Sequence, residues 1–182
     1  MKSIKLIEKS NNIANKNIAL IGHMGSGKSI IGKKFAQIID FDFLDTDSFI
    51  EKKTGKSINE IFSESGEIFF RQLEENYISK ILHKKNYVFS LGGGVMNNLN
   101  LRNIIKRNSY NIYLEVEINI LSKRLESSKN RPLINSKNIN EKLKELIKKR
   151  KNFYKEADLT IKNEKKISDT INALKNNFQI YD

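Results

Sequence analysis

The sequence predicts an α/β fold in which a parallel β-sheet is covered by helices on both faces. Three observations support this class. Short apolar runs typical of buried strands alternate with longer segments of helical periodicity. A glycine-rich segment follows the first apolar run and leads into the first helical segment. Acidic residues follow the second run and glycines the third, and ligands bind at these strand ends in parallel sheets.

The alternation places five strands and the helices between them. The predicted strands are residues 17–22, 41–45, 86–91, 110–116 and 157–161. The predicted helices are residues 28–39, 57–84 with a break near Gly66, 97–107, 117–127, 139–156 and 167–178. No repeat and no low-complexity linker interrupts this pattern, so we expect a single domain over residues 17–182.

Length and composition exclude several classes of protein. A chain of 182 residues suffices for one core, and no run approaches the ~20 apolar residues that a membrane-spanning helix needs. Residues 1–16 are too polar for a signal peptide, and we interpret them as a short N-terminal extension. The chain has no cysteine, which excludes disulfides and thiolate metal sites. We therefore expect a cytoplasmic monomer without membrane contact.

The charge balance raises the question of nucleic acid, since the formal net charge is +12. Residues 137–166 alone hold eleven lysines and arginines against five acids. No recognisable nucleic-acid module and no interleaved aromatic residues accompany them, so we do not expect a nucleic-acid partner. The chain has 27 lysines but only 6 arginines. Each arginine is therefore informative, because a guanidinium can bind a carboxylate or phosphate through two parallel hydrogen bonds and an ammonium cannot.

Residues 22–29 read GHMGSGKS and fit the phosphate-binding pattern G-x-x-x-x-G-K-[ST] between a strand and a helix. In such a loop, backbone N–H groups and the helix N-terminus face phosphate oxygens. Lys28 would reach the β- and γ-phosphates, and the Ser29 hydroxyl would bind Mg²⁺. Ile30 stands where the dinucleotide pattern G-x-G-x-x-G needs its third glycine, so we predict a nucleoside triphosphate as ligand. We assign no role to His23.

Two carboxylates, Asp45 and Asp47, end the second predicted strand, and strand periodicity directs them the same way. The simplest interpretation is a polar turn with a helix cap. However, the carboxyl ends of parallel strands share one rim of the sheet, so both acids belong beside the phosphate loop. One could hold Mg²⁺ through its waters while the other accepts a hydrogen bond from the hydroxyl that is phosphorylated. We favour this kinase arrangement over a cap.

Glycines and a polar loop mark two further places on this rim. Three consecutive glycines, residues 92–94, follow the third predicted strand, and one glycine usually suffices for a turn. Three in a row indicate close approach of a ligand to the backbone. Residues 127–138 are polar and contain the only proline, Pro132, so they form either a mobile lid or a plain surface connection.

Two arginines lie at unexpected positions in predicted helices. Arg150 continues the apolar stripe of helix 139–156, where a leucine would be expected. A cation on a buried stripe is costly unless it meets an internal acid or lines a pocket for an anion. Arg71 lies within helical reach of Glu67 and Glu74. It forms either a surface ion pair or, oriented by Glu74, a site for a ligand carboxylate.

Taken in order, several motifs resemble those of the shikimate kinase family. They are GHMGSGKS (22–29), LDTD (44–47), GKSINEIF (55–62), GEIFFRQLE (66–74), LGGG (91–94), NRPLI (130–134) and RKNFY followed by EAD (150–158). The resemblance covers the chain from about residue 17 to its C-terminal helix. It implies a three-layer P-loop kinase fold with sheet order 2-3-1-4-5 and a lid over about residues 122–138. It also implies transfer of the γ-phosphoryl group of ATP to the 3-hydroxyl of shikimate, on the route to chorismate and the aromatic amino acids.

The resemblance further implies roles for individual residues. Catalysis would depend on Lys28, Asp47 and Arg131. ATP would be bound by Gly25, Ser26, Gly27, Lys28, Ser29, Ile30, Arg124 and Arg131, and Mg²⁺ by Ser29 and, through water, by Asp45. Shikimate would be bound by Asp47, Arg71, Gly92, Gly93, Gly94 and Arg150, with Glu74 holding Arg71. The remaining arginines, Arg102 and Arg107, are interpreted as plain surface residues.

The sequence departs from the family pattern at two points. The family often places a late proline against the adenine, but residues 162–169 read KNEKKISD. Many phosphate-loop enzymes end the third strand with a metal-binding aspartate, and this chain has Ser90, which predicts a role through water. Two alternative functions remain at this stage. One is a kinase for gluconate or a nucleoside monophosphate, and the other is a basic phosphate-loop protein that binds nucleotide and nucleic acid.

Overall fold

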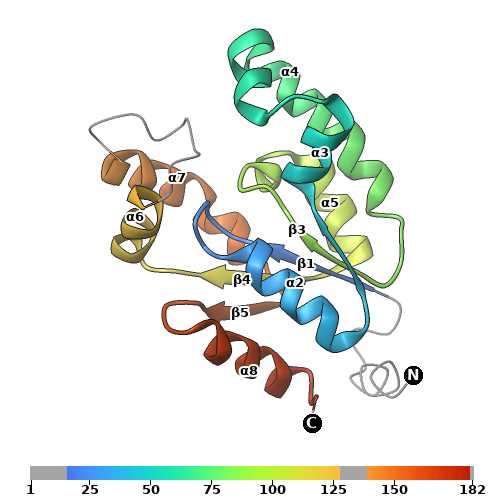
Figure 1. Cartoon of the computed structure of the whole chain (residues 1–182), viewed down its shortest axis with the longest axis vertical. Coiled ribbons are helices and arrows are strands. Elements are labelled where there is room, and N and C mark those ends of the chain that lie inside the picture. The colour runs from blue at the N-terminus through green and yellow to red at the C-terminus, as the bar shows by residue number, and fades with distance from the viewer. Residues whose placement is uncertain (1–15, 128–138, 181–182) are drawn as a thin grey trace.

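The computed structural model describes residues 16–127 and 139–180. At its centre is one five-stranded sheet with the order β2-β3-β1-β4-β5, in which all neighbouring strands are parallel (Figure 1). The strands are β1 (Asn17–Ile21), β2 (Asp42–Asp45), β3 (Tyr87–Ser90), β4 (Ser109–Glu115) and β5 (Leu159–Lys162). The predicted fold class and strand order are confirmed.

Helices cover both faces of the sheet, because the strands are apolar on both sides. In β1, Ile18 and Leu20 face one core, while Ala19 and Ile21 face the other. The first core is closed by α2 (Lys28–Ile39) and α8 (Ile167–Asn177). The second is closed by α4 (Ile58–Ile81), α5 (Leu99–Asn108) and the end of α7 (Ile139–Tyr154). Among the described helices, none is long and apolar enough to cross a membrane.

Two smaller clusters extend beyond the main cores toward the rim of the sheet. One joins α3 (Thr46–Thr54) to the first half of α4 through Ile50, Ile61 and Phe70. The other joins α6 (Ile118–Glu126) to α7 through Leu121, Leu125 and Leu143. In Figure 1, α6 and α7 lie toward the end of β4, whereas α3 and the first part of α4 lie above β3. Residues of α3, α4 and α7 line a common cavity.

Most predicted elements match within two residues, but α3 was missed. The nine-residue helix begins directly after β2, and its apolar residues are too few to establish a helical period in the sequence. Asp45 caps its first turn. The predicted break near Gly66 is confirmed, since Gly66 has φ 80° inside α4. A short 3₁₀ helix, η1 (Val95–Asn97), precedes α5 and was not predicted.

Candidate active site

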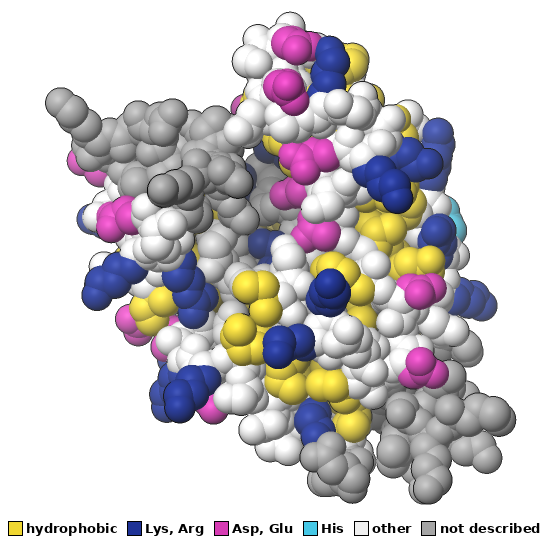
Figure 2. Space-filling model, in the orientation of Figure 1, with side chains coloured by type: hydrophobic (Ala, Val, Ile, Leu, Met, Phe, Trp, Pro, Cys, Tyr) yellow, Lys and Arg dark blue, Asp and Glu magenta, His cyan; other side chains and the backbone are white. Residues whose placement is uncertain are grey.

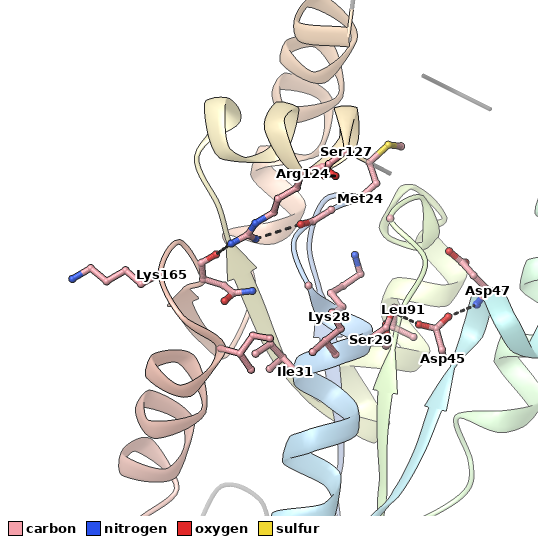
Figure 3. Close-up of a pocket in the computed structure, with 17 residues that line it drawn as sticks. Met24, Lys28, Ser29, Ile31, Asp45, Asp47, Leu91, Arg124, Ser127 and Lys165 are labelled. Atoms are coloured by element: carbon pink, nitrogen blue, oxygen red, sulfur yellow. Dashed lines mark hydrogen bonds between the residues drawn. The ribbon is translucent and has the colours of Figure 1, made fainter. Parts of the chain in front are cut away.

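The phosphate loop connects β1 to α2 and curls around the Lys28 side chain. Lys28 is buried, and its Nζ donates to Gly22 O at 3.0 Å and His23 O at 2.9 Å. Gly27, the residue before α2, has φ 87°, and a Cβ there would lie 2.7 Å from Asn163 Nδ2. Only glycine fits both constraints. Gly25, Gly27, Lys28, Ser29 and Ile30 all line one cavity of about 500 Å³, drawn in Figure 3. Ser26 is buried behind it.

Asp45 serves as a helix cap and as a partner of the phosphate loop. Its Oδ1 accepts from the backbone N of Asp47 at 3.1 Å and of Ser48 at 3.3 Å, which caps α3. Its Oδ2 accepts from Ser29 Oγ at 2.5 Å (Figure 3). Ser90 Oγ, at the end of β3, lies 3.4 Å from the same hydroxyl. The expectation that these acids do not form a helix cap was therefore wrong for Asp45, which caps α3 with one oxygen and contacts Ser29 with the other. The expected role of Asp45 toward Mg²⁺ stays a prediction.

Asp47 lies where two cavities meet. It lines the phosphate-loop cavity and also a second cavity of about 560 Å³. We call the second one the acceptor cavity, and its walls come from α3, α4, the residues after β3, and α7. Met24 and Gly93 also line both. A group held in either cavity can thus approach Asp47.

The acceptor cavity contains two arginines in contrasting environments. Arg71 is held by two glutamates: its Nη1 donates to Glu74 Oε2 at 2.7 Å, and its Nε and Nη2 donate to Glu67 Oε1 at 3.3 and 3.1 Å. Arg150 is 6% exposed, and among the described residues it forms no salt bridge and its Nε has no hydrogen-bond partner. These contacts favour one of the two alternatives for each arginine. Arg71 is oriented by the buried Glu74 as well as paired with Glu67, and Arg150 lines a pocket without an acidic partner in a salt bridge among the described residues. A buried guanidinium with an unsatisfied donor is suited to an anionic ligand.

Glu74 is 2% exposed at the back of this cavity. Burial raises the pKa of its carboxyl, the nearby Arg71 opposes that change, and Asp47 adds to it. A Cβ on Gly92 would lie within 3.4 Å of both carboxylates. Asp47 and Glu74 therefore converge on one point of the backbone, with Arg71 balancing their charge.

The glycine segment, residues 92–94, follows β3 and lets the site's own side chains approach the backbone. Arg71 occupies the place that a side chain on Gly94 would take, since its guanidinium lies within 3.0 Å of that Cβ position. Arg150 Nη1 lies 3.3 Å from the corresponding position on Gly93. The contacts at this segment are made by Asp47, Glu74 and the two arginines. The expected approach of a ligand to its backbone stays a prediction.

Arg124 closes the far end of the phosphate-loop cavity. From α6, its Nη1 donates to Gly25 O at 3.4 Å and its Nη2 to Asn163 O at 2.8 Å (Figure 3). Asn163 Nδ2 donates in turn to Ser26 O at 2.7 Å, and its Oδ1 accepts from Thr170 Oγ1 at 2.7 Å. The segment that lacks the late proline is thus hydrogen-bonded to the phosphate loop. Ile30 and Ile167, both more than a third exposed, line the same cavity.

Two predictions about the remaining arginines have different outcomes. Arg107 is exposed, as expected. Arg102 is not a plain surface residue: its Nη1 donates to Met96 O at 2.8 Å, and its guanidinium lies 4.0 Å from the Phe153 ring centroid. It ties α5 to η1 and α7. Arg131 and most of the predicted lid lie outside the described residues, and residues 122–126 form the end of α6.

Four buried residues of the site were missed or left without a role in the sequence analysis: Thr46, Asn163, His23 and Tyr154. Thr46 is hydrogen-bonded to the glycine segment, and Asn163 to the phosphate loop. His23 packs edge-on against Tyr154, with ring centroids 4.9 Å apart. Burial, followed by the charges of Arg150 and Lys28, lowers the pKa of His23 to about 4, so it is neutral at pH 7. One feature of the sequence could have indicated Thr46: strand alternation directs its side chain opposite to those of its two acidic neighbours.

Comparisons with known proteins agree with this geometry. The family model described as Shikimate kinase matches residues 24–177. A shikimate kinase from Sulfurihydrogenibium sp. (strain YO3AOP1) is 42% identical over 156 residues, which cover 86% of this chain and 93% of the relative. The solved structure of shikimate kinase from Acinetobacter baumannii in complex with shikimate is 33% identical, with a TM-score of 0.85, and the match covers 90% of this chain and 93% of that one.

Other solved structures separate family from fold. Shikimate kinase from Bacteroides thetaiotaomicron has a TM-score of 0.84 at 29% identity, over 91% of this chain and 99% of that one. A gluconokinase from Sinorhizobium meliloti 1021 has a TM-score of only 0.58 at 12% identity, over 90% and 91% of the two chains, which indicates a common fold alone. The match to the family model and the identity to the relatives show that the chain belongs to the shikimate kinase family, the ATP-dependent kinases of the shikimate pathway.

Proposed function

We propose that this chain transfers the γ-phosphoryl group of ATP to the 3-hydroxyl of shikimate with the residue roles given below. The observation that carries these roles is the position of Asp47, which lines both the phosphate-loop cavity and the acceptor cavity. A hydroxyl held in the acceptor cavity can hydrogen-bond Asp47 while it faces a phosphate in the neighbouring loop. Asp47 would orient this hydroxyl and take its proton. The chain would contribute mainly positioning and charge neutralisation, as is usual in phosphoryl transfer.

On the nucleotide side, the triphosphate would lie along the backbone of residues 25–30. Lys28 would exchange its hydrogen bonds to loop carbonyls for the β- and γ-phosphates, which bear more negative charge. Arg124 borders the same cavity and is fixed by two backbone carbonyls, so its planar guanidinium can stack on the base. We propose that Arg131 closes over the phosphates, although it lies outside the described residues.

The donor set beside the phosphate loop fits Mg²⁺. Ser29 Oγ and Asp45 Oδ2 are hard oxygen donors that already lie 2.5 Å apart, and Mg²⁺ prefers such oxygens together with water and phosphate. Among the described residues, no group of three or more His, Cys, Asp or Glu side chains could hold a metal ion by itself. When bound with ATP, the ion would neutralise charge on the phosphate oxygens.

On the acceptor side, the carboxylate of shikimate would lie between Arg71 and Arg150. Arg150 supplies a buried cation with an unsatisfied N–H, and Arg71 is aligned by Glu74 and Glu67. The glycine segment presents only backbone to the cavity, which lets Asp47, Arg71 and Arg150 lie close to it around the ring. A nucleobase would offer no anion to these arginines, which favours a carboxylate-bearing acceptor.

The whole-chain expectations are carried forward as part of the same proposal. We propose a monomer as the active unit. On the face seen in Figure 2, lysine and arginine side chains are spread over the surface and do not gather in one patch, which supports a small-molecule substrate over nucleic acid. Cytoplasmic ATP would be the phosphoryl donor.

The test is ADP release from ATP and Mg²⁺ in a coupled assay with one acceptor at a time. The acceptors are shikimate, gluconate, a mixture of nucleoside monophosphates, and none. We expect turnover on the order of 1–100 per second with shikimate alone. Comparable turnover with gluconate would contradict shikimate as the acceptor. Salt-dependent binding of RNA, without turnover that depends on an acceptor, would contradict the proposed kinase activity and favour a nucleic-acid-binding protein.

A further inference from the structure

The glycine segment is hydrogen-bonded to two buried hydroxyls that come from other parts of the fold. Thr46 Oγ1, at the start of α3, accepts from Gly92 N at 2.9 Å and donates to Ser90 O at 3.2 Å. Tyr154 Oη, at the end of α7, donates to Gly93 O at 3.1 Å. Thr46 is 0% and Tyr154 1% exposed. The two bonds of Thr46 are buried, and the bond of Tyr154 to Gly93 O is partly buried.

Three consecutive glycines need such external constraints. Glycine has the largest backbone freedom of any residue, so a run of three has many conformations to lose when it becomes ordered. Within the segment's own turn, Val95 N donates to Gly92 O at 3.1 Å and Asn97 N to Gly94 O at 2.9 Å. These bonds fix the C-terminal side of the segment. The Gly92 N–H and the Gly93 carbonyl, which adjoin the acceptor cavity, depend on the two hydroxyls.

Each hydroxyl is itself fixed by the elements that carry charged site residues. Thr46 lies between Asp45, which contacts the phosphate loop, and Asp47, which lines the acceptor cavity. The Tyr154 ring stacks on Tyr113 with centroids 4.8 Å apart and meets the edge of His23 from the phosphate loop. The glycine segment is thus attached on one side to the two aspartates and on the other to α7, which bears Arg150 one turn earlier.

We propose that Thr46 and Tyr154 are positioning residues that clamp the glycine segment in the conformation needed for acceptor binding. The Thr46 hydroxyl sets the segment against Asp47, and the Tyr154 hydroxyl sets it against Arg150. Neither side chain is assigned a contact with the acceptor. The part of the proposal that concerns the acceptor rests on the proposed function of this cavity, whereas the clamp itself does not.

The experiment compares Thr46→Val, Thr46→Ser and Tyr154→Phe with the parent chain. Valine keeps the shape of threonine but cannot bond either backbone group, and serine keeps the hydroxyl. We expect Thr46→Val to raise the KM for shikimate by about tenfold, with the KM for ATP changed by less than about twofold. Thr46→Ser should stay within about threefold of the parent, and Tyr154→Phe should raise the shikimate KM by about fivefold. Thr54→Val, at the other end of α3, is the matched control, because its hydroxyl bonds only residues of α3 and the following turn.

Amide hydrogen exchange gives a second readout that needs no substrate. In the parent, the Gly92 amide should exchange slowly, and in Thr46→Val it should exchange at least about tenfold faster. Thr54→Val should leave it unchanged. This measurement stays informative if the acceptor assignment fails, since it reports the clamp directly. Should Thr46→Val not fold, the Tyr154→Phe and Thr46→Ser variants still test the effect on shikimate KM.

Three results would overturn the proposal. The first is an unchanged shikimate KM in both Thr46→Val and Tyr154→Phe, even with lowered melting temperatures, because the hydroxyls would then only stabilise the fold. The second is Thr46→Ser behaving like Thr46→Val, since the methyl group and not the hydroxyl would matter. The third is a Gly92 amide that exchanges at the same rate in parent and Thr46→Val. In contrast, a parent that exchanges as predicted but lacks shikimate-dependent turnover would refute the proposed function and leave the clamp supported.

Discussion

The phosphate loop and the acceptor cavity share one rim of the sheet, but they are stabilised over very different distances along the chain. The loop is held largely by its own backbone: Lys28 bonds carbonyls five and six residues earlier, and Ser26 N donates to His23 O at 3.1 Å. Arg124 and Asn163 each add one bond from far along the chain. The acceptor cavity joins side chains from α3, α4, α7 and the glycine segment. One site is therefore mainly a local backbone conformation, while the other exists only once four segments have packed together.

This difference predicts how each site responds to change. A backbone cradle is insensitive to most side chains around it, because its donors are N–H groups of the loop. A site assembled from long side chains depends on the partner that aligns each of them. Substitutions in the acceptor cavity should therefore affect the binding of the acceptor alone, and substitutions around the loop should affect the binding of ATP alone. The predictions below test this separation.

The largest effect is expected for Arg150→Leu. Removal of a buried cation from its anionic ligand should raise the KM for shikimate by about 100-fold, and leave the KM for ATP within about twofold. Because leucine would complete the apolar stripe of α7 and remove a buried unsatisfied donor, the melting temperature should rise. Steady-state kinetics and thermal unfolding measure both. Arg107→Leu is the control, since Arg107 is exposed on α5; an equal loss there, or an unchanged shikimate KM in Arg150→Leu, would contradict the assignment.

A smaller effect on the other substrate is expected for Arg124→Ala. This change removes the two bonds to Gly25 O and Asn163 O, and with them one wall of the phosphate-loop cavity. The KM for ATP should rise about tenfold and the KM for shikimate should stay within about twofold. Lys123→Ala, the exposed neighbour on α6, should resemble the parent. If the shikimate KM of Arg124→Ala rose as much as the ATP KM, the two sites would not be separable in this way.

The smallest effect is a pH dependence at Glu74. Burial raises the pKa of this carboxyl, so its proton is bound more tightly in the folded than in the unfolded chain. Its contribution to stability is thus fully present below the ordinary glutamate pKa and is lost as the pH rises through the raised value. Glutamine does not titrate, so the Glu74→Gln variant does not lose stability in this way as the pH rises. The melting temperature of Glu74→Gln relative to the parent should therefore increase between about pH 4 and pH 8, by a few degrees.

A difference in melting temperature that stayed constant over this range would show that the carboxyl titrates alike in both states. Glu67→Gln, at an exposed partner of Arg71, is the matched control. Glu74→Gln should also raise the shikimate KM by about threefold, because Arg71 loses a charged partner.

The parts predicted from sequence are those encoded locally. The phosphate loop was found from eight consecutive residues, and the break at Gly66 from one glycine in a helical pattern. The inward position of Arg150 followed from helical periodicity alone. Thr46 and Asn163 gave no comparable signal, because their partners lie 46 and 137 positions away. The short α3 was missed because its caps and tertiary contacts, and not its own periodicity, make it a helix.

The two arginines outside the cavities show the same limit. Arg102 and Arg107 lie on one helix and look alike in sequence, yet only Arg102 is fixed by Met96 O and the Phe153 ring. Whether an arginine serves a ligand, a neighbour or the solvent depends on what packs against its helix. Such packing is decided by residues far away in the chain.

The most direct test of the central claim is a comparison of Asp45→Asn with Asp47→Asn. The claim is that Asp45 serves Mg²⁺ and Asp47 serves the acceptor hydroxyl. Initial rates of ADP release should be measured while Mg²⁺ and shikimate are varied independently, with ATP binding followed by calorimetry. We predict that Asp47→Asn lowers kcat by at least about 100-fold at saturating Mg²⁺ with ATP affinity nearly unchanged, whereas Asp45→Asn raises the Mg²⁺ requirement and is partly restored by excess Mg²⁺. An Asp47→Asn variant within twofold of the parent, or one rescued by Mg²⁺ like Asp45→Asn, would contradict the division of roles.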